Sequence, residues 1–167
     1  ALAEAPGVRG RMERFVQADL SAGLPDELDD DYDVVLAADV IEHLADPSVL
    51  LRDMANRVTP SGSVIASVPN IGHWYPRARV TAGRFDYDQR GILDSTHLRF
   101  FSRRSFLRTT GEAGLTPTAG AHTGLPLDAL GLSDSGRSVR AVSSIDRTLV
   151  RAWPTLFAYQ FVFEFSV

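Results

Sequence analysis

Two carboxylates and a histidine gather where an apolar run of the sequence ends. The run is "VVLAA", residues 34–38, and Asp39, Glu42 and His43 follow it. Histidine, with an unperturbed pKa of about 6.5, can remove a proton at neutral pH, and a nearby carboxylate can assist it. The same residue types also serve as turn and helix-start residues. The cluster therefore predicts either an acid–base site or a plain strand-to-helix joint.

Strand and helix signals alternate along the chain around this cluster. Short apolar or β-branched runs predict strands, and apolar residues at helical spacing predict helices. The predicted strands are 14–20, 33–38, 63–68 and 156–166, and the predicted helices are 47–58, 103–113 and 143–152. This alternation predicts an α/β fold with a Rossmann-like, mostly parallel sheet flanked by helices and an antiparallel C-terminal strand. The nearly continuous run at 34–38 is typical of a strand buried on both faces.

Polar groups follow three consecutive predicted strands. Asp19 ends the first, Asp39 follows the second, and Pro69 with Asn70 ends the third. Ligands of open α/β sheets bind beyond the carboxyl ends of the strands. Turn or cap chemistry explains any one of these residues equally well, but their joint occurrence favours a site at this edge.

Composition excludes several classes of protein. The 167 residues carry a net charge of −4, without the basic patch of nucleic-acid binders. No cysteine is present, which excludes disulfides, thiolate zinc sites and cysteine nucleophiles. No signal peptide and no long apolar segment is evident. We expect one cytoplasmic domain over residues 1–167 that acts on a small molecule, without nucleic acid or membrane, its oligomeric state open.

A long connection follows the third predicted strand. Residues 71–101 are predicted to form a lid or substrate loop, because connections of this length often bind ligands. Aromatic rings there suit stacking on a sugar, His97 can assist proton transfer, and arginine can bind phosphate or carboxylate. The candidate substrate residues are His73, Tyr75, Tyr87 and Arg99. Alternatively the aromatic residues only cover the sheet, and Arg99 pairs with Asp94.

A second irregular segment lies at 116–140. It is rich in Gly, Pro, Ser and Thr. We expect a weak strand at its start and a flexible connection after it.

Four segments together resemble a known family. They are "VQADL", "DVVLAADVIEHLADP", "GSVIASVPN" and "GILDSTHLRFFSRRSFLRTTGEAGL". The chain resembles the class I S-adenosylmethionine-dependent methyltransferases over most of residues 14–115. The likeness is nearest to a bacterial branch that acts on small molecules and glycan precursors. The segment around "DVIEHLADP" is fairly specific for this family, and "LDSTHLRFF" sharpens the likeness.

The resemblance implies S-adenosylmethionine as cofactor and assigns roles to residues of this chain. Asp19 would face the adenine amino group, and Leu20 would pack on the ring. The methionine and adenosine side would be lined by Ala37, Ala38, Asp39 and Val40. Catalysis would fall to His43 as general base, with Glu42 beside it and His97 as a second proton acceptor. Some similar quinone O-methyltransferases hold a divalent metal with a Glu and His here, but we expect none, since no further ligand is evident.

The family's glycine-rich loop and first strand have no counterpart here. The chain's own glycines follow the wrong elements to replace that loop. The resemblance therefore implies an N-terminally truncated domain or, alternatively, a chain that repacks without the missing strands. We expect it to bind the cofactor weakly or not at all, and to be weakly active or inactive in methyl transfer.

Three functions remain open. The first is methyl transfer to oxygen or nitrogen of a small molecule or glycan precursor. The second is a non-catalytic binding module that keeps the fold. The third, a nicotinamide-dependent oxidoreductase, is disfavoured because the chain has no lysine and hence no Tyr-x-x-x-Lys pair.

Overall fold

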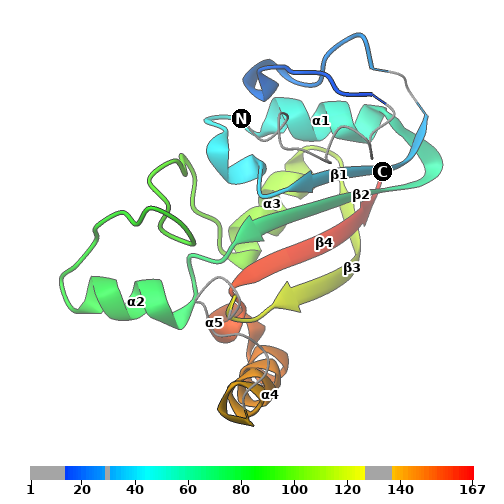
Figure 1. Ribbon diagram of the computed structural model, residues 1–167. Coiled ribbons are helices and arrows are strands. Elements are labelled where there is room, and N and C mark those ends of the chain that lie inside the picture. The colour runs from blue at the N-terminus through cyan, green and yellow to red at the C-terminus, as the bar shows by residue number, and fades with distance from the viewer. Residues whose placement is uncertain (1–13, 29–30, 127–136) are drawn as a thin grey trace.

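Four strands form one sheet in the order β1-β2-β4-β3 (Figure 1). The computed structural model describes residues 14–28, 31–126 and 137–167. The strands are β1 (Tyr32–Ala38), β2 (Val58–Pro69), β3 (Thr116–Thr123) and β4 (Gln160–Ser166). β1 and β2 pair in parallel, whereas β4 is antiparallel to both β2 and β3. Three strands therefore run in one direction, and β4 runs against them.

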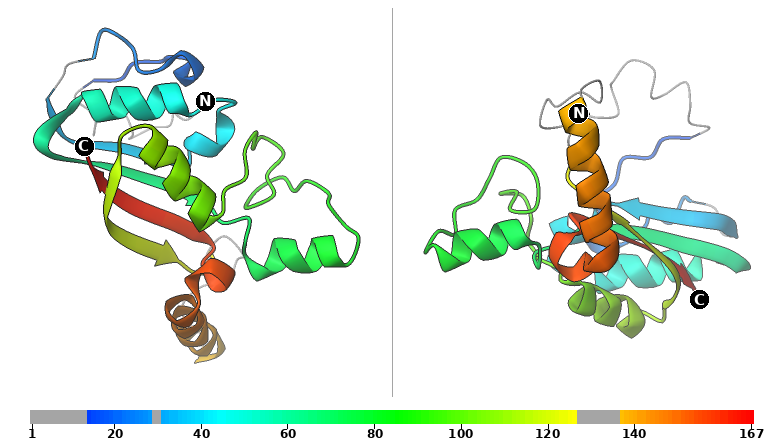
Figure 2. Two further views of the ribbon diagram at one scale, coloured as in Figure 1. Left: turned by 180° about the vertical axis from the view of Figure 1, so that it is seen from behind. Right: turned by 90° about the horizontal axis from the view of Figure 1, so that it is seen from below.

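Helices pack on one face of this sheet and at its ends. In chain order they are the 3-10 turns η3 (Leu20–Ala22) and η4 (Ile41–His43), then α1 (Ser48–Asn56), α2 (Trp74–Thr81), α3 (Arg103–Glu112), α4 (Arg137–Ala152) and α5 (Pro154–Phe157). α1 and α3 lie together on one face, and α2 lies beyond the carboxyl end of β2 (Figure 2). α5 joins α4 to the start of β4. No described helix is both long and apolar enough to span a bilayer.

The core lies between β2, β4 and the two covering helices. Every second residue of β4 is a phenylalanine, and Phe161, Phe163 and Phe165 are buried on the covered face. Phe106 of α3 meets Phe163 and Phe165 with ring centroids 6.1 and 6.0 Å away. The alternation thus makes one side of β4 a platform on which α3 rests.

Local sequence sets where the two covering helices begin and which side they bury. Ser102 and Ser105 form a reciprocal capping box that starts α3. In α1, Leu50, Leu51 and Met54 recur at helical spacing, and all three are buried. Both helices agree with the predicted ones to within two residues.

The fold class is confirmed, with differences in detail. The strand predicted at 14–20 is absent: residues 14–19 pair with no described strand, and Asp19 instead caps η3 by accepting a hydrogen bond from the Ser21 amide. A strand needs a partner for its backbone groups, and a cap satisfies them locally.

β1 is buried on one face only, which contradicts the two-faced burial predicted from its sequence. Val34 and Leu36 are 54% and 63% exposed. The reason is that α1 and α3, the helices packed on the sheet, both lie on its other face.

The strand predicted at the start of segment 116–140 is present, but a helix already begins before the segment ends. β3 occupies 116–123, and α4 begins at Arg137, earlier than the predicted 143. The flexible connection predicted between them falls largely on residues 127–136, which lie outside the described part of the chain.

Candidate active site

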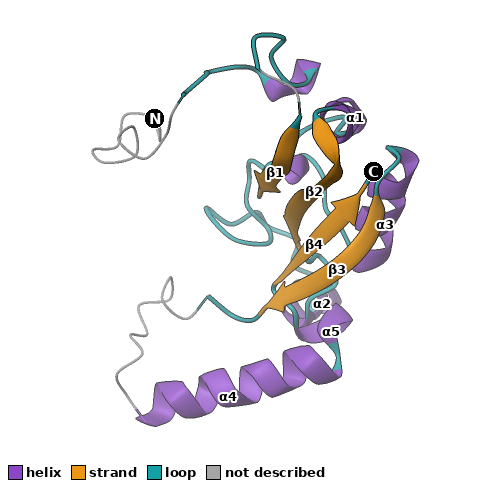
Figure 3. Ribbon diagram, turned by 90° about the vertical axis from the view of Figure 1, so that its right-hand side faces the viewer, coloured by secondary structure: helices purple, strands orange, loops and turns teal. Residues whose placement is uncertain are grey.

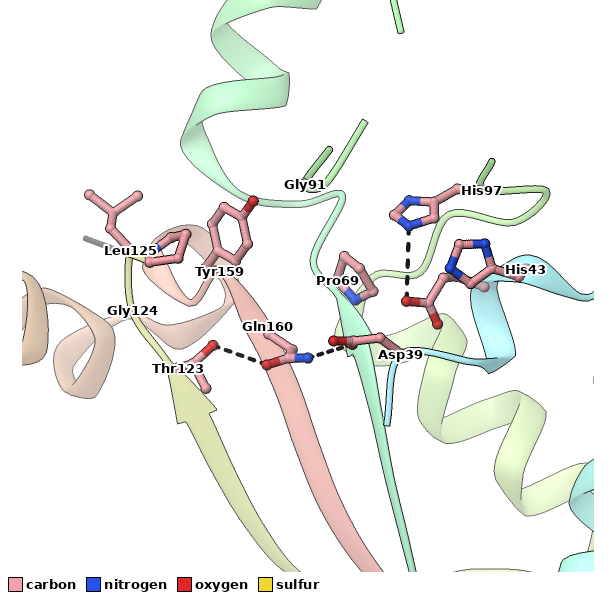
Figure 4. Close-up of a pocket in the computed structure, with 12 residues that line it drawn as sticks. Asp39, His43, Pro69, Gly91, His97, Thr123, Gly124, Leu125, Tyr159 and Gln160 are labelled. Carbon is pink, nitrogen blue, oxygen red and sulfur yellow. Dashed lines mark hydrogen bonds and ion pairs between the residues drawn. The ribbon is translucent and has the colours of Figure 1, made fainter. Parts of the chain in front are cut away.

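Asp39 links the ends of all four strands. It adopts a left-handed backbone conformation (φ +53°), which aspartate tolerates better than most residues. The Ser67 hydroxyl of β2 donates to the Asp39 carboxylate at 3.1 Å, and the Gln160 amide of β4 also donates to it. Thr123 of β3 donates to the Gln160 side-chain oxygen at 3.4 Å. Figure 4 shows the contacts from Thr123 through Gln160 to Asp39, all three of which line a pocket.

The turn η4 brings Glu42 and His43 above this floor. Ile41 is fully buried and anchors the turn in the core. The Glu42 carbonyl oxygen accepts hydrogen bonds from the amides of Leu98 and Arg99, each at 2.9 Å. These two bonds hold the "THLR" stretch of the long connection against η4. His97 is thereby placed beside Glu42 and His43, although 54 residues separate the two histidines in the chain.

The carboxyl group of Glu42 is buried without a hydrogen-bonding partner among the described residues. Its side chain is 1% exposed, and neither carboxyl oxygen has a partner among the described residues. Burial raises the pKa of Glu42 to about 7, and the nearby negative charge of Asp39 adds to the rise. The nearest basic atom is His97 Nε2, 4.0 Å from Glu42 Oε1. Burial also lowers the pKa of His97, so the surroundings favour the uncharged form of each group.

Backbone carbonyls orient both imidazoles. His43 Nδ1 lies 3.1 Å from the Thr96 oxygen, and His97 Nδ1 lies 3.2 Å from the Ile92 oxygen. A carbonyl only accepts, so each Nδ1 donates to it, and in the neutral form of each imidazole Nε2 carries the lone pair. The ring centroids are 4.8 Å apart. Two lone pairs and a carboxyl group therefore meet in one cluster.

The cluster can handle a proton or hold a cation. His43 is the more accessible base, while Glu42 and His97 lie behind it. One donor atom from each of Glu42, His43 and His97 lies within 4.8 Å of the other two. Two imidazoles and a carboxylate suit a divalent transition metal. The sequence prediction of no metal rested on a missing further ligand, and His97 is a candidate for that ligand.

The cluster forms one wall of a pocket of about 530 Å³. The opposite wall consists of Gly124, Leu125 and Tyr159, with Gly91 at the rim (Figure 4). Gly91 has φ +94°, and a Cβ there would come within 2.5 Å of the Tyr159 hydroxyl. Sequence reasoning missed Tyr159 and Gln160 as lining residues, because the tail was interpreted only as a strand. Tyr159 directly precedes β4 and Gln160 begins it, a start that the strand predicted from residue 156 did not mark.

The pocket brings together only part of the predicted cofactor set. Asp39 lines it, and Ala38 and Val40 adjoin Asp39 in the chain without lining it. Ala37 is buried in the core. Leu20 packs against the core from η3. Asp19 is exposed beside it, and its bonds to Ser21 lower the pKa of its carboxyl group.

The candidate substrate residues mostly stabilise the long connection itself. His73 is buried as the N-cap of α2, where its Nδ1 accepts a hydrogen bond from the Tyr75 amide, and burial lowers its pKa to about 4. The Tyr75 hydroxyl and the Arg79 guanidinium both bind Asp88, at 3.1 and 2.7 Å. Neither His73 nor Tyr75 lines the pocket.

Tyr87 and Arg99 also lie outside the pocket. Tyr87 is 56% exposed and stacks on Phe100. Arg99 Nε donates to the Ala45 carbonyl at 2.6 Å, while the Asp94 carboxylate accepts hydrogen bonds from Thr96. The long connection thus delivers His97 and Gly91 to the pocket, and its role as a lid stays a prediction.

A family model described as "Methyltransferase domain" matches residues 6–119, more than half of the chain. The chain belongs to this methyltransferase family. No curated protein matches it. The family match agrees with the predicted S-adenosylmethionine cofactor, since η4 and the carboxyl ends of β1 and β2 lie within the matched residues.

A solved structure from Thermotoga maritima shares the fold of this methyltransferase domain at low sequence identity, and two others are less similar. A SAM-dependent methyltransferase from Thermotoga maritima, described as a possible histamine N-methyltransferase, is 14% identical with a TM-score of 0.55; the match covers 87% of this chain and 60% of that one. A SAM-dependent methyltransferase from Archaeoglobus fulgidus is 17% identical with a TM-score of 0.49, over 83% and 61% of the two chains. A Haloferax volcanii methyltransferase, solved in complex with the activator Trm112, is 15% identical with a TM-score of 0.49. The match covers 87% of this chain and 58% of that one. The methyltransferase domain thus spans about three fifths of the length of these proteins.

Proposed function

We propose that this domain transfers a methyl group from S-adenosylmethionine to an oxygen or nitrogen atom of a small molecule or glycan precursor. The observation that carries the proposal is the Glu42–His43–His97 cluster at the carboxyl ends of the strands, within the residues that match the methyltransferase family. In open α/β sheets this edge is where ligands bind.

The pocket residues fit such a cofactor and acceptor. When bound, S-adenosylmethionine supplies a methyl group already activated by a sulfonium charge, so the acceptor needs only a free lone pair. Asp39 offers a carboxylate that lines the pocket. Asp19, the N-cap of η3, and Leu20, its first residue, are the proposed contacts for the adenine ring.

His43 is the proposed general base. Its Nδ1 proton is held by the Thr96 carbonyl, so Nε2 is free to accept a proton from an acceptor hydroxyl. The ring centroid of His97 lies 4.8 Å from that of His43, and the Glu42 carboxyl group lies 4.0 Å from His97 Nε2. Because the pKa of Glu42 is raised to about 7, its carboxyl group can exchange a proton with the cluster near neutral pH.

Substitution of His43 tests this role against a structural one. We expect His43→Ala to lower the rate of methyl transfer by about 10²-fold to 10⁴-fold. Transfer is measured with methyl-labelled S-adenosylmethionine and a panel of hydroxyl- and amine-bearing small molecules and sugar nucleotides. Calorimetry with S-adenosylhomocysteine should show nearly unchanged affinity, since His43 serves the acceptor. The matched control is His122→Ala, because His122 lies on β3 outside the pocket.

The same experiment separates the competing functions. Binding of S-adenosylhomocysteine without transfer to any acceptor would favour a non-catalytic module. Full activity in His43→Ala would assign the residue to the turn rather than to catalysis.

A metal-assisted form of the same reaction is the second candidate. It is favoured by the two buried, unpartnered oxygens of Glu42, which a divalent cation would satisfy. Glu42, His43 and His97 would hold the ion, which would supply a positive charge that stabilises an acceptor oxygen in its deprotonated form. Calorimetric titration with Mn²⁺ or Zn²⁺ tests this, since Glu42→Gln and His97→Ala should each abolish binding. Equal binding by both variants would place the ion elsewhere.

A further inference from the structure

α4 stands apart from the sheet and is strongly amphipathic. Figure 3 shows the helix lying beside the body of the protein and joined to it through α5. Its apolar residues Val142, Ile145 and Leu149 recur at a spacing of three and four residues, so they form one stripe. These side chains are 45%, 61% and 37% exposed, and Trp153, directly after the helix, is 58% exposed. An apolar stripe of this size is thus open to solvent.

The opposite side of α4 is basic. Arg140, Arg147 and Arg151 are exposed, and at 3.6 residues per turn they lie on the side away from the stripe. The helix sequence holds four arginines and one aspartate, a net charge of +3, whereas the whole chain carries −4. The remainder of the chain therefore carries −7, and α4 is a basic element in an acidic protein.

The body holds α4 by a third side. Val150 is buried, and the Asp146 carboxylate accepts a hydrogen bond from the Leu125 amide at 3.2 Å. Both residues lie about a right angle around the helix from the stripe, given 3.6 residues per turn. Asp146, the one acidic residue of the helix, thus faces the body, whereas the apolar stripe faces solvent. Leu125 also lines the pocket, so α4 adjoins the pocket rim.

We propose that α4 is an interfacial anchor that lies on an anionic phospholipid bilayer. A basic helix with a large exposed apolar side and a terminal tryptophan has the composition of helices that lie in the plane of the interface. The stripe and Trp153 enter the boundary between headgroups and acyl chains. A helix about 10 Å across that sinks about 5–10 Å into the headgroup layer keeps its polar side level with the lipid phosphates. Arginine forms charge-assisted hydrogen bonds to phosphate there.

Charge favours a bilayer over a second copy of the chain. Packing the stripes of two copies together would cover the apolar residues but would bring two helices of charge +3 side by side. An anionic bilayer covers the stripe and neutralises the arginines at once. This inference concerns binding alone and holds whether or not the domain transfers methyl groups.

The test is co-sedimentation of the full chain with vesicles. One set contains phosphatidylglycerol with phosphatidylcholine, and the other contains phosphatidylcholine alone. We expect binding to the first set, weakened by high NaCl because salt screens exposed charges. Arg140→Glu/Arg147→Glu/Arg151→Glu should weaken binding at least ~100-fold, since each basic residue near the surface contributes about fivefold. Ile145→Glu/Leu149→Glu should abolish it.

Matched controls come from other helices. Val80→Glu on α2 replaces a 55% exposed apolar residue, and Arg104→Glu on α3 reverses an exposed arginine. Both should bind like the wild type. Circular dichroism confirms that each variant is folded. Should the stripe variant unfold, the fluorescence of Trp153 in a Trp74→Phe background gives the answer, because brominated lipids should quench it on binding.

Three results would overturn the proposal. They are no binding of the wild type to phosphatidylglycerol vesicles, an equal loss in the control variants, or no quenching of Trp153. Light scattering that shows a dimer lost only in the stripe variant, with lipid binding unchanged, would assign the stripe to a second copy.

Discussion

Replacement of Glu42 by glutamine should stabilise the protein at alkaline pH and have little effect at acidic pH. The carboxyl group is buried without a hydrogen-bonding partner in the described part of the chain, and its pKa rises from the usual 4.5 to about 7 on folding. A group whose pKa is raised by folding favours the native state while protonated, so this contribution is lost as the pH climbs from 4.5 to 7. At about 1.4 kcal/mol for each pH unit, the cost above pH 7 approaches about 3 kcal/mol. Glutamine has nearly the same shape and cannot ionise.

The assay is urea unfolding of wild type and Glu42→Gln at pH 5 and pH 8, in buffer with a metal chelator. The difference in unfolding free energy between the two proteins should grow by about 2–3 kcal/mol from pH 5 to pH 8. Titration of His97 is common to both proteins and largely cancels. Glu112→Gln, at the exposed end of α3, should show no such growth. A variant less stable than the wild type at both pH values would refute the reasoning, because it would mean that Glu42 is ionised and partnered in the native state.

Two further substitutions test the packing that supports the site. Gly91→Ala should lower the free energy of unfolding by about 1–3 kcal/mol, since φ is +94° and the added Cβ would meet the Tyr159 hydroxyl. Tyr159→Phe in the same background should restore part of the loss. Thermal unfolding that shows no decrease in stability for Gly91→Ala would contradict the contact. Phe106→Ala should lower the free energy of unfolding in urea by about 3–5 kcal/mol, because the ring is fully buried against the β4 phenylalanines. Phe85→Ala is the control and should cost little, since Phe85 is 53% exposed. Equal losses would contradict the assigned core.

Sequence periodicity predicted the elements that pack on the core. Leu50, Leu51 and Met54 marked α1 by helical spacing, and the aromatic, β-branched composition of the tail marked β4. The same reasoning failed for residues 14–20, where a cap at Asp19 replaced strand pairing. The prediction that β1 is buried on both faces was also wrong, since a run of apolar residues does not reveal whether helices cover both faces of the strand.

The site was predictable where it lies close in sequence and hidden where it depends on long-range placement. Asp39, Glu42 and His43 stand together in the chain, and the structure keeps them together. His97 was noticed as a titrating group, but its position next to Glu42 depends on two backbone bonds to η4 that no local pattern reveals. His73 has the same residue type, yet it caps α2 and is buried, so residue type alone could not separate the two roles.

The place of β4 in the sheet constrains the order in which the protein can fold. β4 is the last strand in the chain, yet it lies between β2 and β3 and contributes three phenylalanines to the core. During synthesis, β2 and β3 emerge first and have no strand between them to pair with. The site network shares this delay, because Gln160 and Tyr159 belong to the same late segment. Closing contacts across about 100 residues is entropically costly and slow. The newly made chain therefore leaves part of the apolar side of β2 uncovered until β4 has emerged, and during that interval the exposed surface favours aggregation.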